Sequence, residues 1–320
     1  MMIIGVAREN REKNERRVVL LPKYVKTLVE DGNIVLVEKN AGEKLGINDQ
    51  EYEKNGAKIS LRNDVYCAEI VLRIRAPTLE ELKMMKKGSL LVCMVHRDNH
   101  PELIKEFRRR EINVLELNEI KNDEGKRLIE AFALSASEGI KAGFDLFQKL
   151  YKKIPVRVVI MGYGNIAQPA IAAACRLGAV VKVLGRKQTS RRFIKDNLRE
   201  AEILINATYR KPEEIGKYLI KKEDLLVMDK NSLILDFSAD PISCIETCHP
   251  TSLDNPYYFV SVNQRRIPHM CIYSLPGLSP LKCSKRYGRQ ILPIIRLIAK
   301  IGLTGALNKQ PNLNRALIKI

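Results

Sequence analysis

Short apolar runs alternate with helical patterns along the first 120 residues of the chain. Five of these runs have the length of a single buried strand: Ile3–Val6, Ile34–Val37, Ile70–Ile74, Ser89–Val95 and Asn113–Leu117. The segments between them carry helical patterns, most of which Gly or Pro opens or ends: Lys23–Leu28, Tyr52–Gly56, Leu79–Met85 and Pro101–Arg109. Because strands that alternate with short helices pair side by side, the pattern predicts a parallel α/β sheet.

The same alternation continues after a longer helical pattern in the middle of the chain. Apolar positions spaced by three and four predict a helix over Ala136–Lys152, which Pro155 ends. The expected strands after it are Val156–Met161, Val180–Leu184, Ile203–Ala207 and Leu233–Phe237, with an alanine-rich helix at Gln168–Leu177. These elements predict a second, doubly wound sheet, whose ligand would lie at the carboxyl ends of the strands, near Ala207 and Ser238.

A glycine turn joins the first of these later strands to the alanine-rich helix. It reads Gly162-Tyr163-Gly164-Asn165-Ile166-Ala167 and fits the dinucleotide pattern G-x-G-x-x-A. Gly162 permits the tight turn, Gly164 lets a pyrophosphate approach the backbone, and Ala167 lets the helix pack against the strand. Asn165 and Ile166 open the helix, whose free N–H groups attract phosphate. The alternative is an ordinary tight strand-to-helix turn.

The end of the next strand indicates which dinucleotide is bound. An NAD site usually places a carboxylate here for the ribose 2′-hydroxyl, but this strand ends in Gly185-Arg186-Lys187. Two cations in that place favour the 2′-phosphate of NADP(H). The alternative is a solvated basic loop beside a site that does not discriminate between the cofactors.

Composition and charge narrow the function classes. The net charge is +18, and the last 66 residues hold 11 Lys or Arg and no acidic residue. No aromatic ladder or helix-turn-helix pattern accompanies them, so a solvated basic face or an anionic ligand is favoured over nucleic acid. Apolar stretches such as Ile291–Ile301 are interrupted by Arg296 and Lys300, and no leader pattern opens the chain, so we expect no membrane span and a cytoplasmic protein.

The seven cysteines show no framework spacing, and an odd number is typical of reduced thiols. The closest group, Cys244, Cys248 and His249, lacks a second pair of ligands. No metal site is therefore expected.

Several longer motifs resemble the alanine dehydrogenase and transhydrogenase-α superfamily, which also includes the lysine-forming saccharopine dehydrogenases. Asn14–Pro22 reads N-E-R-R-V-V-L-L-P and is similar to the family's N-E-x-R-V-x-L-x-P. Ala68–Pro77 is similar to A-D-I-V-x-K-V-K-x-P, and Val37–Gly42 to the V-E-K-G-A-G segment. Two later signatures are matched by Glu246–Tyr258 and Leu275–Gly277.

The resemblance implies two Rossmann-like domains and a reaction at an amine carbon. Residues 1–130 with 280–320 would form a discontinuous substrate domain, and 131–279 an inserted dinucleotide-binding domain, with the cleft between them. The family reaction is the reversible oxidation of an amine to an imine or oxo acid by hydride transfer to a nicotinamide. A homo-oligomer is compatible with the family, which includes both hexamers and monomers.

The resemblance also implies roles for individual residues. By matching position, Arg17 would bind the substrate carboxylate, Arg75 would stand at the place of the substrate-binding Lys, and His96 would be the acid/base. Asp240 would face substrate and nicotinamide, and Ser135 would touch the cofactor pyrophosphate. A guanidinium suits a carboxylate, and an imidazole suits proton transfer near neutral pH. From its position alone, Arg17 would read as a surface cation.

Departures from the family pattern shape the functional expectation. Arg75 replaces the family Lys and cannot exchange a proton, and Asp240-Pro241-Ile242-Ser243 replaces the D-Q-G-G of the alanine enzymes. With the basic strand end, we expect an NADP(H)-dependent oxidoreductase that reduces an amino-acid-derived imine or 2-oxo acid. Two arginines would suit a dicarboxylate or a preformed imine. The alternatives are a non-catalytic NADP(H)-binding or redox-sensing relative and an NAD-linked alanine dehydrogenase proper.

Overall fold

The computed structural model divides the chain into two compact units, described here one at a time. Unit 1 is Met1–Ala131 with Pro280–Ile320, and unit 2 is Phe132–Ser279. The structure describes every residue except 10–14, 98–99, 210–213, 215, 239–242 and 319–320.

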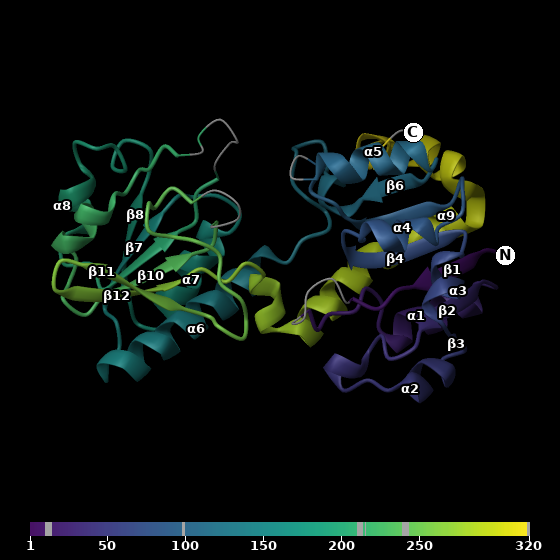
Figure 1. Cartoon of the computed structure of the whole chain (residues 1–320), viewed down its shortest axis with the longest axis horizontal. Coiled ribbons are helices and arrows are strands. Elements are labelled where there is room, and N and C mark those ends of the chain that lie inside the picture. Colours follow the sequence, from purple (N-terminus) through teal and green to yellow (C-terminus); the bar gives the residue numbers. More distant parts are fainter. Residues whose placement is uncertain (10–14, 98–99, 210–213, 215, 239–242, 319–320) are drawn as a thin grey trace. The chain divides into compact units, whose positions relative to one another are not determined.

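Unit 1 is built on a seven-stranded sheet with the order β13-β6-β5-β4-β1-β2-β3 (Figure 1). Its strands are β1 (Ile3–Val6), β2 (Ile34–Glu38), β3 (Lys58–Ser60), β4 (Ile70–Arg75), β5 (Leu90–Met94), β6 (Asn113–Glu116) and β13 (Leu317–Ile318). All neighbours pair in parallel except β13, which is antiparallel to β6. The order reverses between β1 and β4, and in such sheets the carboxyl ends of the strands at the reversal collect functional groups.

The helices of unit 1 begin where the sequence supplies a suitable first residue. They are α1 (Pro22–Glu30), α2 (Asp49–Glu53), α3 (Arg62–Tyr66), α4 (Leu79–Lys83), α5 (Pro101–Arg109), α9 (Pro280–Lys309) and α10 (Pro311–Ala316), with short 3₁₀ helices η1 (Glu43–Leu45) and η3 (Leu117–Glu119). Proline opens α1 and α5, where a missing N–H costs nothing. Asn48 and Thr78 close reciprocal capping boxes at α2 and α4.

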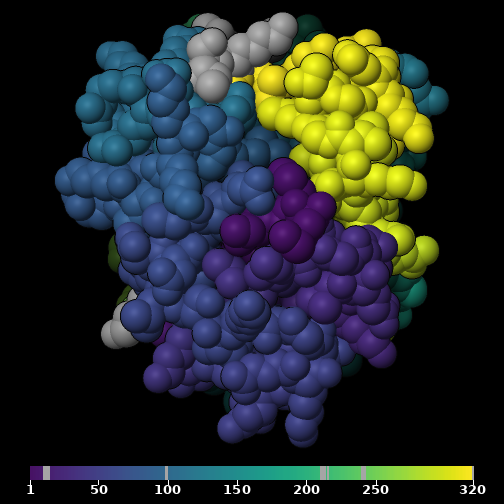
Figure 2. All heavy atoms as spheres, turned by 90° about the vertical axis from the view of Figure 1, so that its right-hand side faces the viewer, coloured from purple at the N-terminus to yellow at the C-terminus, as the bar shows by residue number. Residues whose placement is uncertain are grey.

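The C-terminal segment packs against the N-terminal part of unit 1, and Figure 2 shows the two side by side on one face. Gly288 of α9 lies directly against the ring of Tyr24, whose hydroxyl donates to the Lys285 carbonyl at 2.8 Å. Arg296 Nε donates to Asp31 Oδ2 at 2.6 Å. Helix α9 is thereby part of unit 1, far in sequence from the elements it covers.

Among the described residues, α9 is long and apolar enough to cross a membrane by length and composition, with 28% of its most apolar window buried. One such helix is weak evidence, because the core helix of a soluble protein meets the same criterion. Arg296 and Lys300 interrupt the apolar stretch as expected, but a window of 18 residues in this helix still meets the criterion, which allows up to two charged residues.

Unit 2 carries a six-stranded sheet with the order β11-β12-β10-β9-β7-β8. Its strands are β7 (Arg157–Met161), β8 (Val180–Leu184), β9 (Ile203–Asn206), β10 (Leu233–Asp236), β11 (Tyr258–Val262) and β12 (Arg265–Met270). Strands β8, β7, β9, β10 and β12 run parallel, and β11 is antiparallel to β12. The chain places β8 on one side of β7 and β9 on the other, so this sheet reverses its order at β7.

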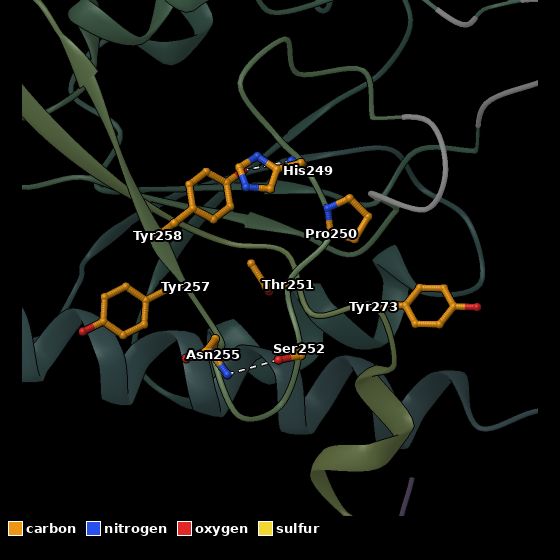
Figure 3. Close-up of a pocket in the computed structure, with 8 residues that line it drawn as sticks. All are labelled: His249, Pro250, Thr251, Ser252, Asn255, Tyr257, Tyr258 and Tyr273. Carbon is orange, nitrogen blue, oxygen red and sulfur yellow. Dashed lines mark hydrogen bonds between the residues drawn. The ribbon is translucent and has the colours of Figure 1, made fainter. Parts of the chain in front are cut away.

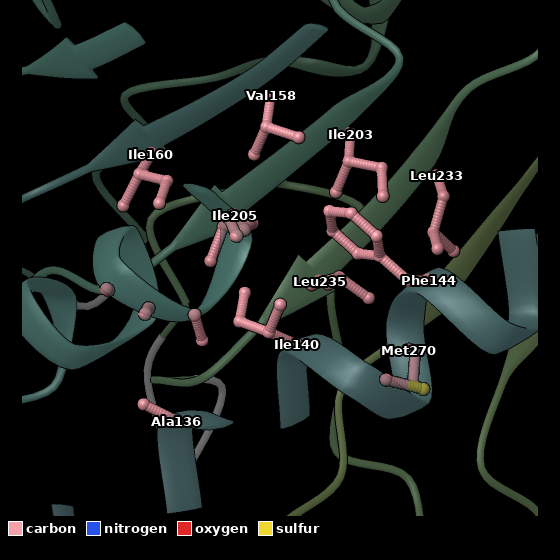
Figure 4. Packing of buried hydrophobic residues seen from close by; sticks show 14 of the residues in the cluster. Ala136, Ile140, Phe144, Val158, Ile160, Ile203, Ile205, Leu233, Leu235 and Met270 are labelled. Atoms are coloured by element: carbon pink, nitrogen blue, oxygen red, sulfur yellow. The ribbon is translucent and has the colours of Figure 1, made fainter. Parts of the chain in front are cut away.

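The helices of unit 2 bury apolar faces against this sheet. They are α6 (Phe132–Tyr151), α7 (Ala167–Arg176) and α8 (Ile194–Leu198), with 3₁₀ helices η5 (Lys222–Val227) and η6 (Leu275–Leu278). Figure 4 shows Ile140 and Phe144 of α6 facing Val158, Ile203 and Leu233 of the strands, all of them buried. This cluster is the core beneath the glycine turn.

The predicted α/β class with two Rossmann-like sheets is confirmed. Strands β3, β11, β12 and β13 have no counterpart among the predicted elements. Strand β3 is three residues long, and β12 contains Pro268 and His269, so neither has an uninterrupted apolar run in the sequence. Strand β11, by contrast, reads Y-F-V-S-V, a β-prone run that sequence reasoning missed.

Candidate functional site

In unit 1, two arginines that are far apart in sequence meet on one carboxylate. Arg17 donates to Glu15 through Nε at 2.7 Å and also through Nη2. Arg75, at the carboxyl end of β4, donates through Nε to Glu15 Oε2 at 3.1 Å. The structure thus brings together the two residues predicted to bind the substrate carboxylate, and it adds Glu15 between them.

Arg17 is not a surface cation: it is 3% exposed. Its guanidinium lies over the ring of Tyr287, with Cζ 5.9 Å from the ring centroid. The backbone N–H of the next residue, Val18, donates to Ser284 Oγ at 3.0 Å. Contacts from α9 therefore hold the Arg17 segment in place.

The charges in this cluster support each other. Hydrogen bonds and Coulomb attraction from Arg17, with help from Arg75, overcome burial and lower the pKa of Glu15 to about 2. Bonding to Glu15 likewise raises the pKa of Arg17 against the cost of burial. Glu15 thus offsets part of the positive charge that Arg17 and Arg75 bring together.

Glu9, at the carboxyl end of β1, positions the end of β4. Its carboxylate accepts from the backbone N–H of Ile74 and, at 3.3 Å, from that of Arg75. Arg73 Nη2 lies 3.6 Å from Glu9 Oε2 and is fully buried. Burial raises the pKa of Glu9, and attraction by Arg73 partly offsets the rise. Glu9 thereby fixes the backbone from which Arg75 projects.

His96 follows β5, next to the strand that ends in Arg75. Its φ is 53°, a left-handed conformation that is uncommon for residues other than glycine, and its N–H donates to Asn118 Oδ1 at 3.4 Å. Burial lowers the pKa of His96, and repulsion by Arg127 and Arg75 lowers it further against attraction by Glu116. The imidazole is therefore neutral at neutral pH and able to accept a proton.

In unit 2, the glycine turn has the geometry that a dinucleotide needs. Gly162 has φ 101°, and a Cβ on it would lie 2.6 Å from the Ala207 carbonyl oxygen. A Cβ on Gly164 would meet nothing within 4 Å, so the backbone there is open. Ala167 is fully buried at the start of α7. The turn therefore fits a pyrophosphate, with Gly162 required by packing and Gly164 free to face a ligand.

Asn165 and Ile166 complete this turn before the first residue of α7. Asn165 is exposed and Ile166 half-buried, with Ile166 at the N-cap position. The Gln168 N–H donates to the Gly164 carbonyl at 3.1 Å, which starts the helix. The first N–H groups of α7, which have no partner within the helix, thus lie at the glycine turn.

The end of β8 presents free positive charge. Gly185, Arg186 and Lys187 are exposed, and no ion pair or side-chain hydrogen bond of Arg186 or Lys187 occurs within the described part of the chain. Arg191, by contrast, is paired with Asp224, donating through Nη2 to Oδ1 at 3.2 Å. The two residues predicted to meet a 2′-phosphate are thus available for an anion, and Arg191 is not.

The remaining predicted cofactor residues lie near the carboxyl ends of the strands or in the first turn of α6. Ala207 follows β9 and is buried, Ser238 follows β10 and is half-buried, and Ser135 is buried in α6. The Ser238 N–H donates to Asp236 Oδ1 at 2.8 Å, which supports a structural role for Asp236. Asp240, predicted to be catalytic, lies outside the described residues.

In unit 2, a hollow of about 610 Å³ is lined mainly by residues of the signature Glu246–Tyr258 (Figure 3). The rings of His249 and Tyr258 stack there at 3.7 Å. Tyr258 Oη donates to the Thr247 carbonyl at 2.8 Å, and Thr251 Oγ1 donates to the Pro256 carbonyl at 3.0 Å. These residues of the signature therefore hold their own loop together. No cluster of metal-binding side chains occurs among the residues that the structure describes.

Sequence reasoning missed Glu15 and Glu9 as parts of the site. Glu15 belongs to the N-E-x-R motif, so its spacing of two residues from Arg17 was an available signal. Glu9 offered no such signal, because its partners are backbone groups at the end of a strand 65 residues away.

Comparisons with known proteins agree with this arrangement. Residues 5–137 match the alanine dehydrogenase/PNT N-terminal domain, and residues 186–320 match the C-terminal domain of the same family. The glycine turn lies between the two matches.

Two relatives and one solved structure show the extent of the likeness. The chain is 26% identical to NAD(P) transhydrogenase subunit alpha of Haemophilus influenzae, over 93% of this chain and 66% of that protein. It is 24% identical to alanine dehydrogenase 1 of Staphylococcus aureus, over 96% and 90%. A solved L-alanine dehydrogenase matches with a TM-score of 0.85 and 26% identity, over 99% of this chain and 94% of the other. This chain belongs to the alanine dehydrogenase/PNT family.

Proposed function

We propose that the protein is an NADP(H)-dependent oxidoreductase that reduces a 2-oxo acid or its imine, with a single carboxylate as the recognised group. Family membership supports a dehydrogenase-type oxidoreductase. NADPH, when bound, supplies the hydride. The protein's own contribution is to bind the dinucleotide, to hold the carboxylate and to transfer a proton.

The observation that carries the proposal is the pair of free cations after β8. Arg186 and Lys187 stand where an NAD enzyme usually has its ribose-binding carboxylate, and both side chains are exposed. A 2′-phosphate would give them the charge-assisted hydrogen bonds that they lack within the chain.

The cluster in unit 1 supports a monocarboxylate. Because Glu15 forms ion pairs with both Arg17 and Arg75, its carboxylate offsets part of their positive charge, which favours one bound carboxylate over two. A dicarboxylate or a preformed imine, which the pair Arg17 and Arg75 suggests from the sequence, stays the alternative that the substrate screen tests.

His96 would be the proton-transfer group. Arg75 lowers the pKa of the imidazole, so a carboxylate bound to Arg75 would weaken that repulsion and raise the pKa. Substrate binding would thus favour the protonated imidazole that a reduction needs as its proton donor.

The first test is a titration of the purified protein with NADPH and with NADH. Wild-type protein should bind NADPH at least tenfold more tightly, and the double variant Arg186→Gln/Lys187→Gln should lose that preference, since each lost contact costs about 1.5–3 kcal/mol. Arg176→Gln is the matched control: Arg176 is an exposed cation in the last turn of α7 and should leave both affinities unchanged. Equal affinity of the wild-type protein for both cofactors would refute the NADP(H) assignment.

The second test is a substrate screen followed at 340 nm, with 2-oxo acids and ammonia or amines. Monocarboxylates should be reduced in preference to dicarboxylates. Efficient NADH-dependent amination of pyruvate would instead make the protein an NAD-linked alanine dehydrogenase.

The similarity to a transhydrogenase subunit favours a second candidate, a nucleotide-binding component without a substrate of its own. Such a protein would bind NADPH but would not oxidise it with any substrate in the screen. Binding without turnover would therefore support this candidate over the first.

A further inference from the structure

Tyr287 is a buried residue of the cation cluster that the motifs did not indicate. It lies on α9, is 4% exposed, and packs its ring 5.9 Å from the guanidinium carbon of Arg17. Arg17, Arg75 and Glu15 all act on the pKa of its phenol, which burial raises. The phenol is therefore close to the group that would bind the substrate carboxylate, and it is neutral at neutral pH.

The hydroxyl of Tyr287 has no hydrogen-bond partner among the described residues. A buried tyrosine hydroxyl usually has one. The enclosed polar atoms without partners in the described chain belong to Arg73, Glu81, Arg97 and Arg265, and the Tyr287 hydroxyl is not one of them. A hydroxyl that is neither paired nor fully enclosed keeps some accessible surface, although the residue as a whole is 4% exposed.

The cluster also needs a donor of this kind. Glu15 occupies Nε and Nη2 of Arg17 and Nε of Arg75. A substrate carboxylate has two oxygens with about four acceptor sites. A neutral hydroxyl adds a donor for a carboxylate oxygen without adding charge.

We infer that Tyr287 is a substrate-binding residue, whose hydroxyl donates a hydrogen bond to the carboxylate that Arg17 and Arg75 attract. The inference rests on the proposed function, because it assumes a carboxylate substrate at these arginines. It extends the site to α9, about 270 residues from Arg17 in the sequence.

The test compares Tyr287→Phe with wild-type protein in calorimetric titrations of the whole chain with pyruvate, in the presence of NADP. The variant keeps the ring over Arg17 and removes only the hydroxyl. Its dissociation constant for pyruvate should rise about tenfold or more, the loss expected for a hydrogen bond to a charged group. With any 2-oxo acid that the screen identifies, KM should rise by the same factor, while NADPH affinity and the urea midpoint stay unchanged.

Tyr24→Phe is the matched control. Tyr24 is a largely buried tyrosine of the same unit, but its hydroxyl donates to the Lys285 carbonyl of α9. This variant should lose stability and keep its affinity for pyruvate.

These measurements separate the role of Tyr287 from the proposed function. If wild-type protein and Tyr287→Phe bind pyruvate equally, or if Tyr24→Phe weakens binding as much, the role of Tyr287 is refuted and the proposed function stands. If wild-type protein binds neither pyruvate nor other 2-oxo acids, the proposed function fails, and the inference fails with it.

Discussion

Replacing each glycine of the dinucleotide turn by alanine should affect a different property: stability at Gly162 and cofactor affinity at Gly164. In Gly162→Ala, a non-glycine residue would have to adopt φ near 101°, and its Cβ would lie 2.6 Å from the Ala207 carbonyl oxygen. Left-handed backbone alone costs roughly 1–2 kcal/mol, and the overlap with a backbone atom forces β7 and β9 apart. We expect a total loss of about 3 kcal/mol in the stability of unit 2.

Gly164→Ala should leave the fold intact and weaken only the binding of the dinucleotide. Its Cβ would meet no atom within 4 Å, and its backbone is not in the left-handed region. The free energy of unfolding should therefore change by no more than about 0.5 kcal/mol, or rise slightly because the unfolded chain loses entropy. The added methyl would occupy the space that a pyrophosphate needs, so NADPH affinity should fall at least tenfold.

Urea unfolding followed by circular dichroism measures the first quantity, and titration of NADPH fluorescence measures the second. Unchanged NADPH affinity in Gly164→Ala would show that no pyrophosphate approaches this backbone. Unchanged stability in Gly162→Ala would contradict the requirement for glycine at that position.

Three further changes test the charges. His96→Gln should lower turnover by roughly 10²–10⁴ and keep NADPH affinity, and an unchanged rate would make His96 a packing residue. Because the pKa of His96 is lowered, amine oxidation by the wild-type protein should decline only below pH 6.5. Glu15→Gln removes one negative charge beside Arg17 and Arg75, so the ratio of KM values should shift in favour of dicarboxylates, and an unshifted ratio would contradict the charge argument. Burial lowers the pKa of His269 to about 4. Between pH 6.5 and 4 the unfolded chain therefore binds a proton that the folded chain does not, and the free energy of unfolding decreases as the pH is lowered through that window. The loss should reach ~3 kcal/mol in urea unfolding and be absent in His269→Gln.

The local features of this protein could be predicted from its sequence. Helix α5 (Pro101–Arg109) and strand β8 (Val180–Leu184) have the bounds that their patterns predict. The glycine turn could be recognised because strand, turn and helix are consecutive in the chain, so their geometry depends on neighbouring residues. The basic end of β8 could be recognised for the same reason.

The partners of the charged side chains were decided only by the tertiary structure. The sequence shows Arg186, Lys187 and Arg191 as equivalent cations, but of these three only Arg191 is paired with Asp224. Arg17 looks like a surface residue until α9 brings Tyr287 over it, and Arg75 meets Glu15 across 60 residues. Hydrophobic periodicity reports which face of an element is buried, whereas an ion pair depends on which elements become neighbours. The pattern of this chain therefore determined its two sheets and its dinucleotide turn, and the packing of distant segments determined the charge that its substrate would meet.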